Sequence, residues 1–378
     1  MRRRTFLSTL TAAGIVTTFR PTIGAAQQRS SKLDLPSLLA VTEVPAISVS
    51  GMIRGKPVQH FAGVRAVSDR VPITPDTYFP AASLTKPVFA WAVRNLIRQG
   101  KLELTRPLQD YADLGLSGDA RRITAEHVLT HSTGLPNWRF QLDKPLAAEF
   151  TPGSRWQYSG EGIFLLQRVV ERIVGVPIGT YMKRTVLQPL GMTASTFAWS
   201  PELQTKAASG HDRRANALER SSVFYEQRNY GVITKADLQP ESALYEQIVG
   251  AYEKAKAQPL PIAMSPNMAG SLWTTAVDYP KFLKAVLSDI PQRTPDYRAR
   301  MRVNPKIAWS LGWGVDESFR RPSYFHWGDG PGFKNFAWVQ PETRTALVFF
   351  TNGDHGQAAY SWAFRALVGA DPASLAWI

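Results

Sequence analysis

Residues 79–92 read FPAASLTKPVFAWA, an apolar, helix-like stretch that opens with a serine and a lysine three positions apart. At this spacing Ser83 and Lys86 lie on one face of a helical turn, within reach of each other. Ser83 alone can be explained as a helix N-cap. The cap does not explain Lys86, because a charge beside an apolar run is costly to bury. The stretch therefore indicates a desolvated lysine that can serve as general base for the neighbouring hydroxyl.

Pro87 follows the lysine directly and has no backbone N–H group. It would remove the N–H that otherwise bonds to the Ser83 carbonyl, so we expect the turn that carries Ser83 to be fixed but irregular. Apolar residues then recur at helical spacing as far as Leu96, and Gly100 supplies a C-terminal stop. The N–H groups at the start of this helix would favour negative charge developing on a bound substrate.

The composition is that of a globular protein with a large core. The chain has 378 residues, of which 44% are hydrophobic and 20% charged. Its net charge of +14 is spread over scattered basic residues without a long basic tract, which argues against nucleic-acid binding. The chain has no cysteine, so disulfides and cysteine ligands are excluded.

Residues 1–26 have the layout of a secretory signal peptide: a basic start, an apolar run over 6–19 and a small-residue stop at 24–26. The run RRTFL at 3–7 fits a twin-arginine signal, and an ordinary Sec signal is the alternative. No later segment is long enough for a transmembrane helix. We therefore expect a periplasmic or secreted protein whose oligomeric state the sequence leaves open.

The order of secondary-structure signals predicts the fold class. Residues 46–65 read as two strands around a Gly-Lys-Pro turn, and residues 105–200 carry mainly helical signals. Short aromatic and β-branched runs follow, and a helix around 358–368 closes the chain: the runs are SLGWGV at 310–315, SYFHWG at 323–328, FKNFAWVQ at 333–340 and TALVFFTN at 345–352. This order predicts an α/β (α+β) protein, with one antiparallel sheet built from N- and C-terminal segments and flanked by helices, plus an inserted all-helical lobe.

Residues 27–378 are expected to form one catalytic domain. In it, 27–100 and 270–378 make the sheet lobe, and 101–269 make the mainly helical lobe. A polar excursion at 221–262 is either a surface elaboration or a roof that contacts substrate. The junction of the two lobes is where a site is expected.

Two further segments place reactive side chains in suitable local structure. TPGSRWQYSGEG at 151–162 puts Tyr158 in a turn just before a helix, and HWGDGPGF at 326–333 puts His326 on a strand followed by small residues. S-x-x-K alone is a weak signal, since Ser and Lys are common. Together with Tyr158 and His326, Ser83 and Lys86 form a plausible acyl-transfer constellation.

The pair His127 and His131 has the spacing of a zinc metalloprotease helix, but Val128 stands where that motif needs glutamate. We therefore expect this segment to be structural and the protein to use neither a metal nor another cofactor.

The sequence resembles the serine β-lactamase and penicillin-binding protein family, in particular the branch of class C β-lactamases, D-alanyl-D-alanine carboxypeptidases and type VIII carboxylesterases. The resemblance runs from about residue 44 to 356. It is carried by ASLTKP, GKLELTRPLQDY, ITAEHVLTHSTGLPNW, TPGSRWQYSGEG, VLQPLGMTASTF, AGSLWTTAVDYPKFL, LGWGV and HWGDGPGFKNFAWVQPE.

The resemblance implies a role for each site residue. Ser83 would be the acylated nucleophile, Lys86 its base or proton relay, and Tyr158 the group that passes a proton to the leaving group. His326 matches the first position of the K-T-G-like strand motif, and the backbone N–H groups of Ser83 and Asp329 would form the oxyanion hole. Gly160, Trp327 and Gly328 would line the substrate site.

Two positions depart from the family pattern. Gly160 stands where the Y-x-N motif has the asparagine that holds the amide of the substrate's acyl side chain, so glycine gives an ester acyl chain more room. Trp327 replaces a small or hydroxylated residue, and either narrows the cleft or packs under the sheet.

We therefore expect an exported serine hydrolase that acts through an acyl-enzyme on small esters or amides, with esters favoured. The alternatives are a D-alanyl-D-alanine carboxypeptidase, a class C-like β-lactamase, and a catalytically silent homologue that binds peptidoglycan. The expected partner is a small-molecule ester, amide or β-lactam, and no nucleic acid.

Overall fold

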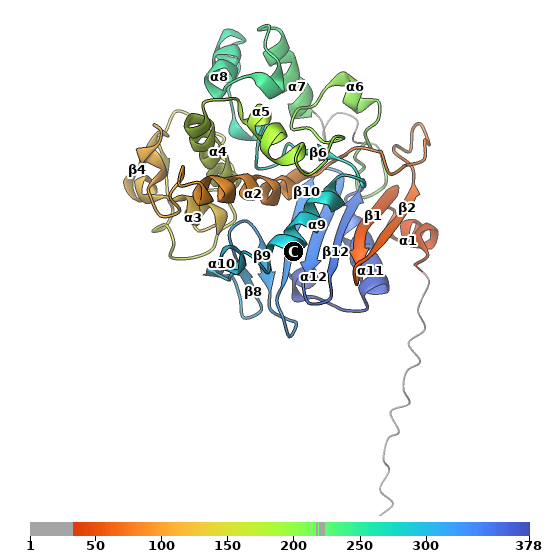
Figure 1. Cartoon of the computed structure of the whole chain (residues 1–378). Helices are drawn as coiled ribbons and strands as arrows, with labels where there is room; N and C mark the ends of the chain where they lie inside the picture. Colours follow the sequence, from red (N-terminus) through yellow and green to blue (C-terminus); the bar gives the residue numbers. More distant parts are fainter. Residues whose placement is uncertain (1–32, 217, 219–223) are drawn as a thin grey trace, which may run out of the picture. The chain divides into compact units, whose positions relative to one another are not determined.

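The computed structural model describes residues 33–216, 218 and 224–378; the expected signal peptide, residues 1–26, lies outside the described residues. An eight-stranded antiparallel sheet organises the described chain, in the order β2-β1-β12-β11-β10-β9-β8-β7 (Figure 1). The N-terminal hairpin β1 (Ala46–Ile53) and β2 (Lys56–Gly63) joins the C-terminal strands through β12 (Thr345–Thr351). The register runs from Ile47 opposite Thr351 to Met52 opposite Ala346. The predicted sheet of N- and C-terminal segments is therefore confirmed.

The rest of the sheet comes from the C-terminal third of the chain. Its strands are β7 (Met301–Arg302), β8 (Ile307–Trp309), β9 (Gly314–Asp316), β10 (Ser323–Gly330) and β11 (Phe333–Gln340). The SYFHWG and FKNFAWVQ runs and all but the last residue of TALVFFTN lie in strands, as predicted, because aromatic and β-branched side chains suit a pleated surface. In the SLGWGV run, only its last two residues belong to a strand.

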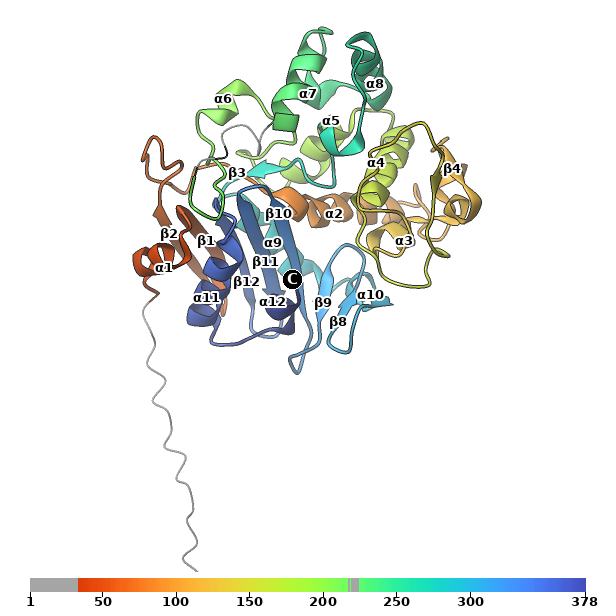
Figure 2. The ribbon, with the colours of Figure 1, turned by 180° about the vertical axis from the view of Figure 1, so that it is seen from behind.

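Helices cover both faces of the sheet. Figure 1 shows α9 (Tyr279–Asp289) in front of it, and Figure 2 shows α11 (Gly356–Val368) and α12 (Ala373–Trp377) on the opposite face. Successive residues of β12 enter different cores: Val348 packs in the core on the α9 side and Phe349 in the core on the α11 side. Because both faces are covered, every residue of β12 is buried.

The middle of the chain is mainly helical. It contains α3 (Ala125–Leu129), α4 (Gly160–Val174), α5 (Ile178–Met182), α6 (Pro201–Gln204), α7 (Phe224–Thr234) and α8 (Tyr245–Lys254). One short strand pair, β4 (Leu116–Ser117) with β5 (Leu146–Ala147), interrupts this helical pattern. A second pair, β3 (Phe79–Pro80) with β6 (Trp273–Thr274), lies outside it. Helix α4 ends at Val174, and Gly175 follows as its C-cap with a φ of 67°, a left-handed value that suits glycine.

The 221–262 excursion forms α7 and α8 in its described part, and these helices share a small hydrophobic core with α4. Ile233, Ile248 and Tyr252 of the excursion pack there with Phe164 of α4. The described chain also contains the helices α1 (Leu35–Thr42), α2 (Thr85–Arg98) and α10 (Thr294–Tyr297). The segment is thus packed onto the helical part of the protein by apolar contacts.

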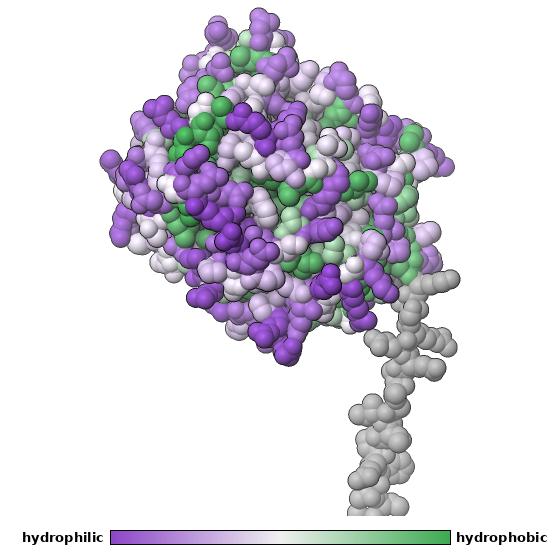
Figure 3. All heavy atoms as spheres, viewed as in Figure 1, coloured by the Kyte–Doolittle hydropathy of each residue, from purple (hydrophilic) through white to green (hydrophobic). Residues whose placement is uncertain are grey.

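The face of the molecule seen in Figure 3 is largely hydrophilic, and the hydrophobic residues on this face form small separate patches. Within the described ranges, none of the helices combines the length and the hydropathy that crossing a bilayer requires.

Candidate active site

The turn that carries Ser83 is short and strained. Ser83 lies in a single 3-10 turn, Ala82–Leu84, between β3 and the helix α2 (Thr85–Arg98). Ala82 has a φ of 48°, a left-handed value that residues with a side chain rarely adopt. The Ala81 N–H donates to the Leu272 carbonyl at 2.8 Å and the Tyr279 hydroxyl donates to the Leu84 carbonyl at 2.9 Å. These bonds to two other segments hold the turn in place.

Pro87 fits without cost because it lies in the first turn of α2. The first N–H groups of a helix have no partner within the helix, so a missing one there breaks no helical bond. The fixed but irregular turn expected from Pro87 is the 3-10 turn before α2.

Lys86 points from α2 onto the serine. Its Nζ donates to Ser83 Oγ at 2.9 Å and to the Ala269 carbonyl at 2.6 Å, and its side chain is buried at 3% exposure. No carboxylate pairs with it in the parts of the chain that the structure describes. Burial therefore lowers the pKa of Lys86 to about 7. A lysine with this pKa is substantially unprotonated at neutral pH and can accept the serine proton.

Tyr158 lies just before α4, close to both side chains. Its ring centre is 4.8 Å from Lys86 Nζ. Burial raises the pKa of Tyr158, the nearby Ser83 hydroxyl works in the opposite direction, and Asp329 raises it further. The phenol therefore keeps its proton at neutral pH. Its buried hydroxyl makes no hydrogen bond of normal geometry to a described residue, which leaves it able to exchange a proton with a substrate.

His326 of β10 is fully buried, at 0% exposure. Its Nδ1 lies 2.8 Å from the Trp327 carbonyl, so Nδ1 carries the proton and Nε2 is the acceptor. Burial, and then the Lys86 charge, lower the pKa of His326 to about 3. His326 is therefore neutral at any physiological pH, and its buried Nε2 has no protein partner among the described residues.

His131 is a site neighbour that the sequence reading did not identify. Its ring stacks on Tyr158 with centres 4.2 Å apart, and its Nδ1 accepts the Ser159 N–H at 3.2 Å. Burial, then Lys86 and His326, keep the pKa of His131 well below its ordinary value. His127, by contrast, serves α3, where its N–H and its Nδ1 form a capping box with Thr124. Nothing local in the sequence distinguishes the two histidines.

Strand β10 packs its last residues against the Ser83 turn. A Cβ at Gly328 would lie 2.3 Å from the Ala81 carbonyl oxygen, so only glycine allows this approach. Asn335 Nδ2 of β11 donates to the Pro80 carbonyl at 2.9 Å and ties the same strands to the chain before Ser83. Gly328 thus lets β10 approach the turn that carries Ser83.

The edge of β10 beyond Phe325 is open on one side. It pairs with β9 only from Ser323 to Phe325, while its pairing with β11 continues to Gly330. Asp329 lies in this half-paired part, and its exposed carboxylate pairs with Lys334. This geometry is compatible with an Asp329 N–H that faces a substrate.

Trp327 packs among aromatic rings. Its ring centre lies 5.4 Å from that of Trp377, 6.0 Å from that of Trp309 and 5.3 Å from that of Tyr158. It belongs to the core on the α11 side of the sheet and does not line the pocket beside Ser83. Of the two alternatives for this residue, packing under the sheet is the one observed.

A pocket of about 270 Å³ opens beside Ser83. It is lined by Pro80, Ala82, Ser83, Trp138, Ile262, Met264, Asn267, Ala269, Gly270, Ser271, Trp273, Asp329, Gly330, Pro331 and Phe333. Among the described residues that line the pocket, Asp329 is the one that is charged, and none is basic. Ile262 brings the end of the 221–262 excursion to the pocket wall.

The sequence model named Beta-lactamase matches residues 37–370 of the chain. The chain belongs to this family. Esterase EstB of Burkholderia gladioli is 34% identical over 172 residues, 37% of this chain and 43% of the esterase. A Beta-lactamase of Pseudomonas fluorescens is 26% identical over 210 residues, 52% of this chain and 58% of that protein. The chain thus spans about half the length of these two curated relatives.

Two further similarities agree with the family. Penicillin-binding protein 4* of Bacillus subtilis is 27% identical over 154 residues, 35% of this chain and 33% of that protein. An octameric penicillin-binding protein homologue from Pyrococcus abyssi superposes with a TM-score of 0.67 at 22% identity, covering 89% of this chain and 76% of the other, which shows the shared fold. The family and the fold class predicted from the sequence are confirmed.

One expectation drawn from the family's Y-x-N motif is wrong. Gly160 was expected to leave extra room for an acyl chain. In the structure the Trp138 indole occupies that space: a Cβ built on Gly160 would lie 2.6 Å from Trp138 Cζ2. Glycine at this position admits a tryptophan wall and leaves no empty volume.

Proposed function

We propose that this member of the Beta-lactamase family hydrolyses small, uncharged carboxylic esters through an acyl-enzyme on Ser83. The observation that carries the proposal is the described lining of the Ser83 pocket, which is largely apolar and aromatic, with Asp329 as its charged residue and no basic side chain among the described residues. β-Lactam antibiotics and D-alanyl-D-alanine peptides both present a carboxylate near the scissile amide. A carboxylate bound without a cationic partner loses hydration that nothing replaces, so a neutral ester suits this pocket better.

Lys334, the basic residue that pairs with Asp329, does not change this conclusion. Its Nζ also lies 3.7 Å from the Asp354 carboxylate, so two acids already balance its charge. A substrate carboxylate would compete with both of them for the same ammonium group.

Acylation begins when Ser83 Oγ attacks the ester carbonyl carbon and Lys86 Nζ accepts the serine proton. The new C–O bond pushes the carbonyl electron pair onto oxygen, where the N–H groups of Ser83 and Asp329 would stabilise the charge. The intermediate collapses by breaking the bond to the alcohol oxygen, which leaves with a proton relayed through Tyr158 from Lys86. Water then attacks the acyl-enzyme in the same way and releases a carboxylic acid and free Ser83.

The protonation states support this division of roles. Lys86, with a pKa of about 7, is a base at neutral pH, whereas burial keeps Tyr158 as a phenol that donates a proton. The hydrogen bond from Lys86 Nζ to Ser83 Oγ places the base on its target at 2.9 Å. A purely binding homologue would gain nothing from burying this lysine, so the arrangement favours an enzyme.

We further propose that residues 1–26 export the protein, through the twin-arginine route, and that residues 27–378 act as one catalytic domain in the periplasm or outside the cell. N-terminal sequencing of protein from the periplasm would test the cleavage. A chain that stays cytoplasmic and uncleaved would contradict this proposal.

The function is tested by kcat/KM for p-nitrophenyl acetate, p-nitrophenyl butyrate, nitrocefin and a D-Ala-D-Ala peptide, with Ser83→Ala as the matched control. We expect the esters to exceed nitrocefin by at least about tenfold, because one unpaired buried polar group costs about that much in rate. A tenfold preference for nitrocefin or for the peptide would contradict the proposed esterase function and would favour a β-lactamase or a carboxypeptidase, respectively. Absence of a fluorophosphonate adduct on Ser83 would favour a silent binding protein.

A further inference from the structure

Trp138 and Gly160 form a complementary pair beside the nucleophile. A Cβ on Gly160 would lie 2.6 Å from Cζ2 and 2.8 Å from Cε2 of the Trp138 indole. Real Cβ atoms do not approach ring carbons this closely, because the overlap is strongly repulsive. The indole and any side chain at position 160 therefore exclude each other.

The loop that carries Trp138 is anchored to helix α4 by the residues on either side of this tryptophan. Asn137, just before the tryptophan, accepts the Gly160 N–H on Oδ1 and the Glu161 N–H on its carbonyl, each at 2.9 Å. Arg139, just after it, pairs its Nε with the Glu161 carboxylate at 2.9 Å. Glu161 is fully buried, so this ion pair is costly to break.

Two of these bonds also satisfy backbone N–H groups at the start of α4, which need hydrogen-bond partners in any case. The first N–H groups of a helix have no partner inside it, and Asn137 supplies partners for two of them. Trp138 is thereby fixed over Gly160 by the same bonds that cap the helix. Its indole also packs against two of the hydrophobic cores, which further limits its movement.

We propose that Trp138 is the specificity-determining residue of this site. Its indole takes the place of a polar side chain at position 160 and gives the Ser83 pocket an apolar wall, together with Trp273 and Phe333. The substrates it selects are esters of short, unbranched aliphatic acids whose acyl chain carries no amide group. The assignment rests on the proposed function, and the family resemblance puts position 160 on the acyl side of the substrate.

A matched pair of esters tests this selection. p-Nitrophenyl pentanoate and p-nitrophenyl N-acetylglycinate have acyl chains of equal length, but only the second contains an amide. We expect the wild type to favour the pentanoate by at least about tenfold in kcat/KM, because the indole leaves the amide unpaired. A wild type that handles both esters equally would overturn the proposal.

A double-mutant cycle tests the exclusion between the two positions. Gly160→Asn alone should lower kcat/KM for both esters, because the new side chain cannot enter without displacing the indole. Gly160→Asn combined with Trp138→Ala should reduce the pentanoate preference by at least about tenfold, because the amide then finds a partner. If Gly160→Asn alone has the same effect as the double variant, the indole does not fill this space and the proposal fails.

The length of the substrate's acyl chain gives an independent test of whether the Trp138 indole limits the pocket. Trp138→Ala should raise the ratio of kcat/KM for p-nitrophenyl octanoate over acetate by about tenfold or more, and Trp138→Phe by less. Trp362→Ala is the matched control, since this tryptophan of α11 is 64% exposed and outside the site. A ratio that changes by less than about twofold in Trp138→Ala would overturn the proposal.

Covalent labelling separates this inference from the proposed function. The rates at which methyl- and octylphosphonofluoridate label Ser83 report on the pocket wall without requiring ester turnover. Suppose that the wild type hydrolyses no ester, but that Trp138→Ala and Trp138→Phe are labelled by the octyl reagent faster, relative to the methyl reagent, than the wild type is. The proposed esterase function is then wrong, and the proposed role of Trp138 is supported. If these variants are folded, as circular dichroism reports, and label like the wild type, the role of Trp138 fails.

Discussion

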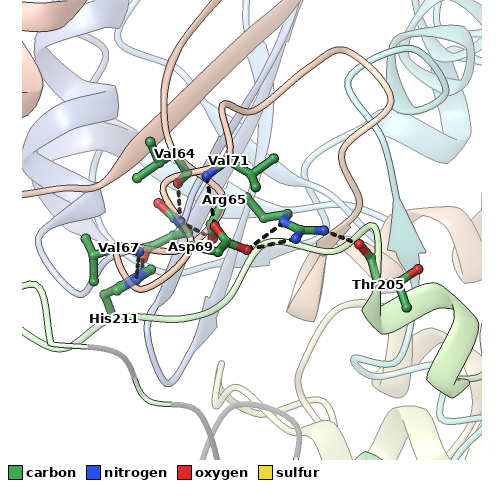
Figure 4. Close-up of polar contacts among 8 residues, drawn as sticks. Val64, Arg65, Val67, Asp69, Val71, Thr205 and His211 are labelled. Atoms are coloured by element: carbon green, nitrogen blue, oxygen red, sulfur yellow. Dashed lines mark hydrogen bonds and ion pairs between the residues drawn. The ribbon is translucent and has the colours of Figure 1, made fainter.

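Two polar regions of this protein each contain a buried histidine: His211 in one, and His326 beside Lys86 in the other. The two regions differ in how many of their hydrogen-bonding groups have a partner. Around His211 both ring nitrogens and the neighbouring Arg65 and Asp69 side chains have partners (Figure 4). His211 is 0% exposed, its Nδ1 donates to the Asn352 carbonyl at 2.8 Å, and its Nε2 accepts the Val67 N–H at 3.2 Å. Beside it, Arg65 bonds the Asp69 carboxylate at 2.8 Å and the Thr205 carbonyl. This region joins the end of β12 to two loops.

Around Lys86, by contrast, buried polar groups lack well-formed hydrogen bonds among the described residues. Neither the Tyr158 hydroxyl nor His326 Nε2 makes a hydrogen bond of normal geometry to a described residue, and the ammonium of Lys86 lies in a site that lowers its pKa. Unpaired buried groups cost about 1–3 kcal/mol each, so the fold must stabilise this cluster from elsewhere. Under the proposed function, the first region would serve stability and the second would serve the chemistry.

The largest effect should come from the nucleophile. Ser83→Ala is expected to lower kcat for the preferred ester by about 10³-fold or more, because no acyl-enzyme can form. Steady-state kinetics measures the loss, and mass spectrometry after fluorophosphonate treatment should find no adduct. An adduct that survives in this variant would mean that another residue is the nucleophile.

Changes at Lys86 should separate chemistry from stability. Lys86→Arg and Lys86→Met should both lose about 10²-fold or more in kcat/KM, because neither side chain can accept a proton at neutral pH. Lys86→Met should also raise the free energy of unfolding at pH 6, by on the order of 1–4 kcal/mol, since it removes a buried charge. Urea unfolding measures the gain. Substantial activity in Lys86→Arg would make this residue a charge anchor and not a base.

The pH dependence follows from the same lysine. With the pKa of Lys86 lowered to about 7, kcat/KM should fall by about tenfold per pH unit below pH 7 and level off above it. His326, neutral above a pKa of about 3, should add no further step in this range. A pH–rate profile from pH 5 to pH 9 tests this, and a flat profile would exclude Lys86 as the base.

Stability should change with pH in a related way. Because the folded-state pKa of Lys86 is about 7 and its ordinary value is 10.5, the unfolded chain binds more protons between these values. Lys86 therefore contributes a free energy of unfolding that rises with pH across this window. Urea titrations at pH 7 and pH 9 should show a smaller increase in Lys86→Met than in the wild type. An equal increase in both proteins would contradict the lowered pKa.

The smallest effect on activity should come from the paired region. His211→Ala should lower the free energy of unfolding by about 1–3 kcal/mol, because the Val67 N–H and the Asn352 carbonyl lose their partner. Its kcat/KM should stay within about threefold of the wild type. Thermal unfolding and ester hydrolysis measure the two quantities. A large loss of kcat/KM without a loss of stability would place His211 in the site and remove the contrast between the regions.

Much of this protein could be read from its sequence because the signals are local. The three-residue spacing of Ser83 and Lys86 survives in the structure as a hydrogen bond of 2.9 Å, since a turn fixes the distance between neighbouring side chains. The aromatic and β-branched runs lie in β10, β11 and β12, because the preference of these residue types for strands is also a local signal. A turn before a helix and a strand followed by small residues point to Tyr158 and His326, which lie in different parts of the chain, and the family resemblance then implies their roles.

Only the tertiary structure decided how these residues are surrounded. Trp138 fills the space over Gly160, 22 positions along the chain, because helix α4 and the preceding loop dock through Asn137 and Glu161. His131 has the same local sequence signals as His127, yet it alone stacks on Tyr158. Periodicity and spacing describe which face of an element a side chain occupies. They do not describe which other element packs against that face, and this packing lowers the pKa of Lys86 and shapes the pocket.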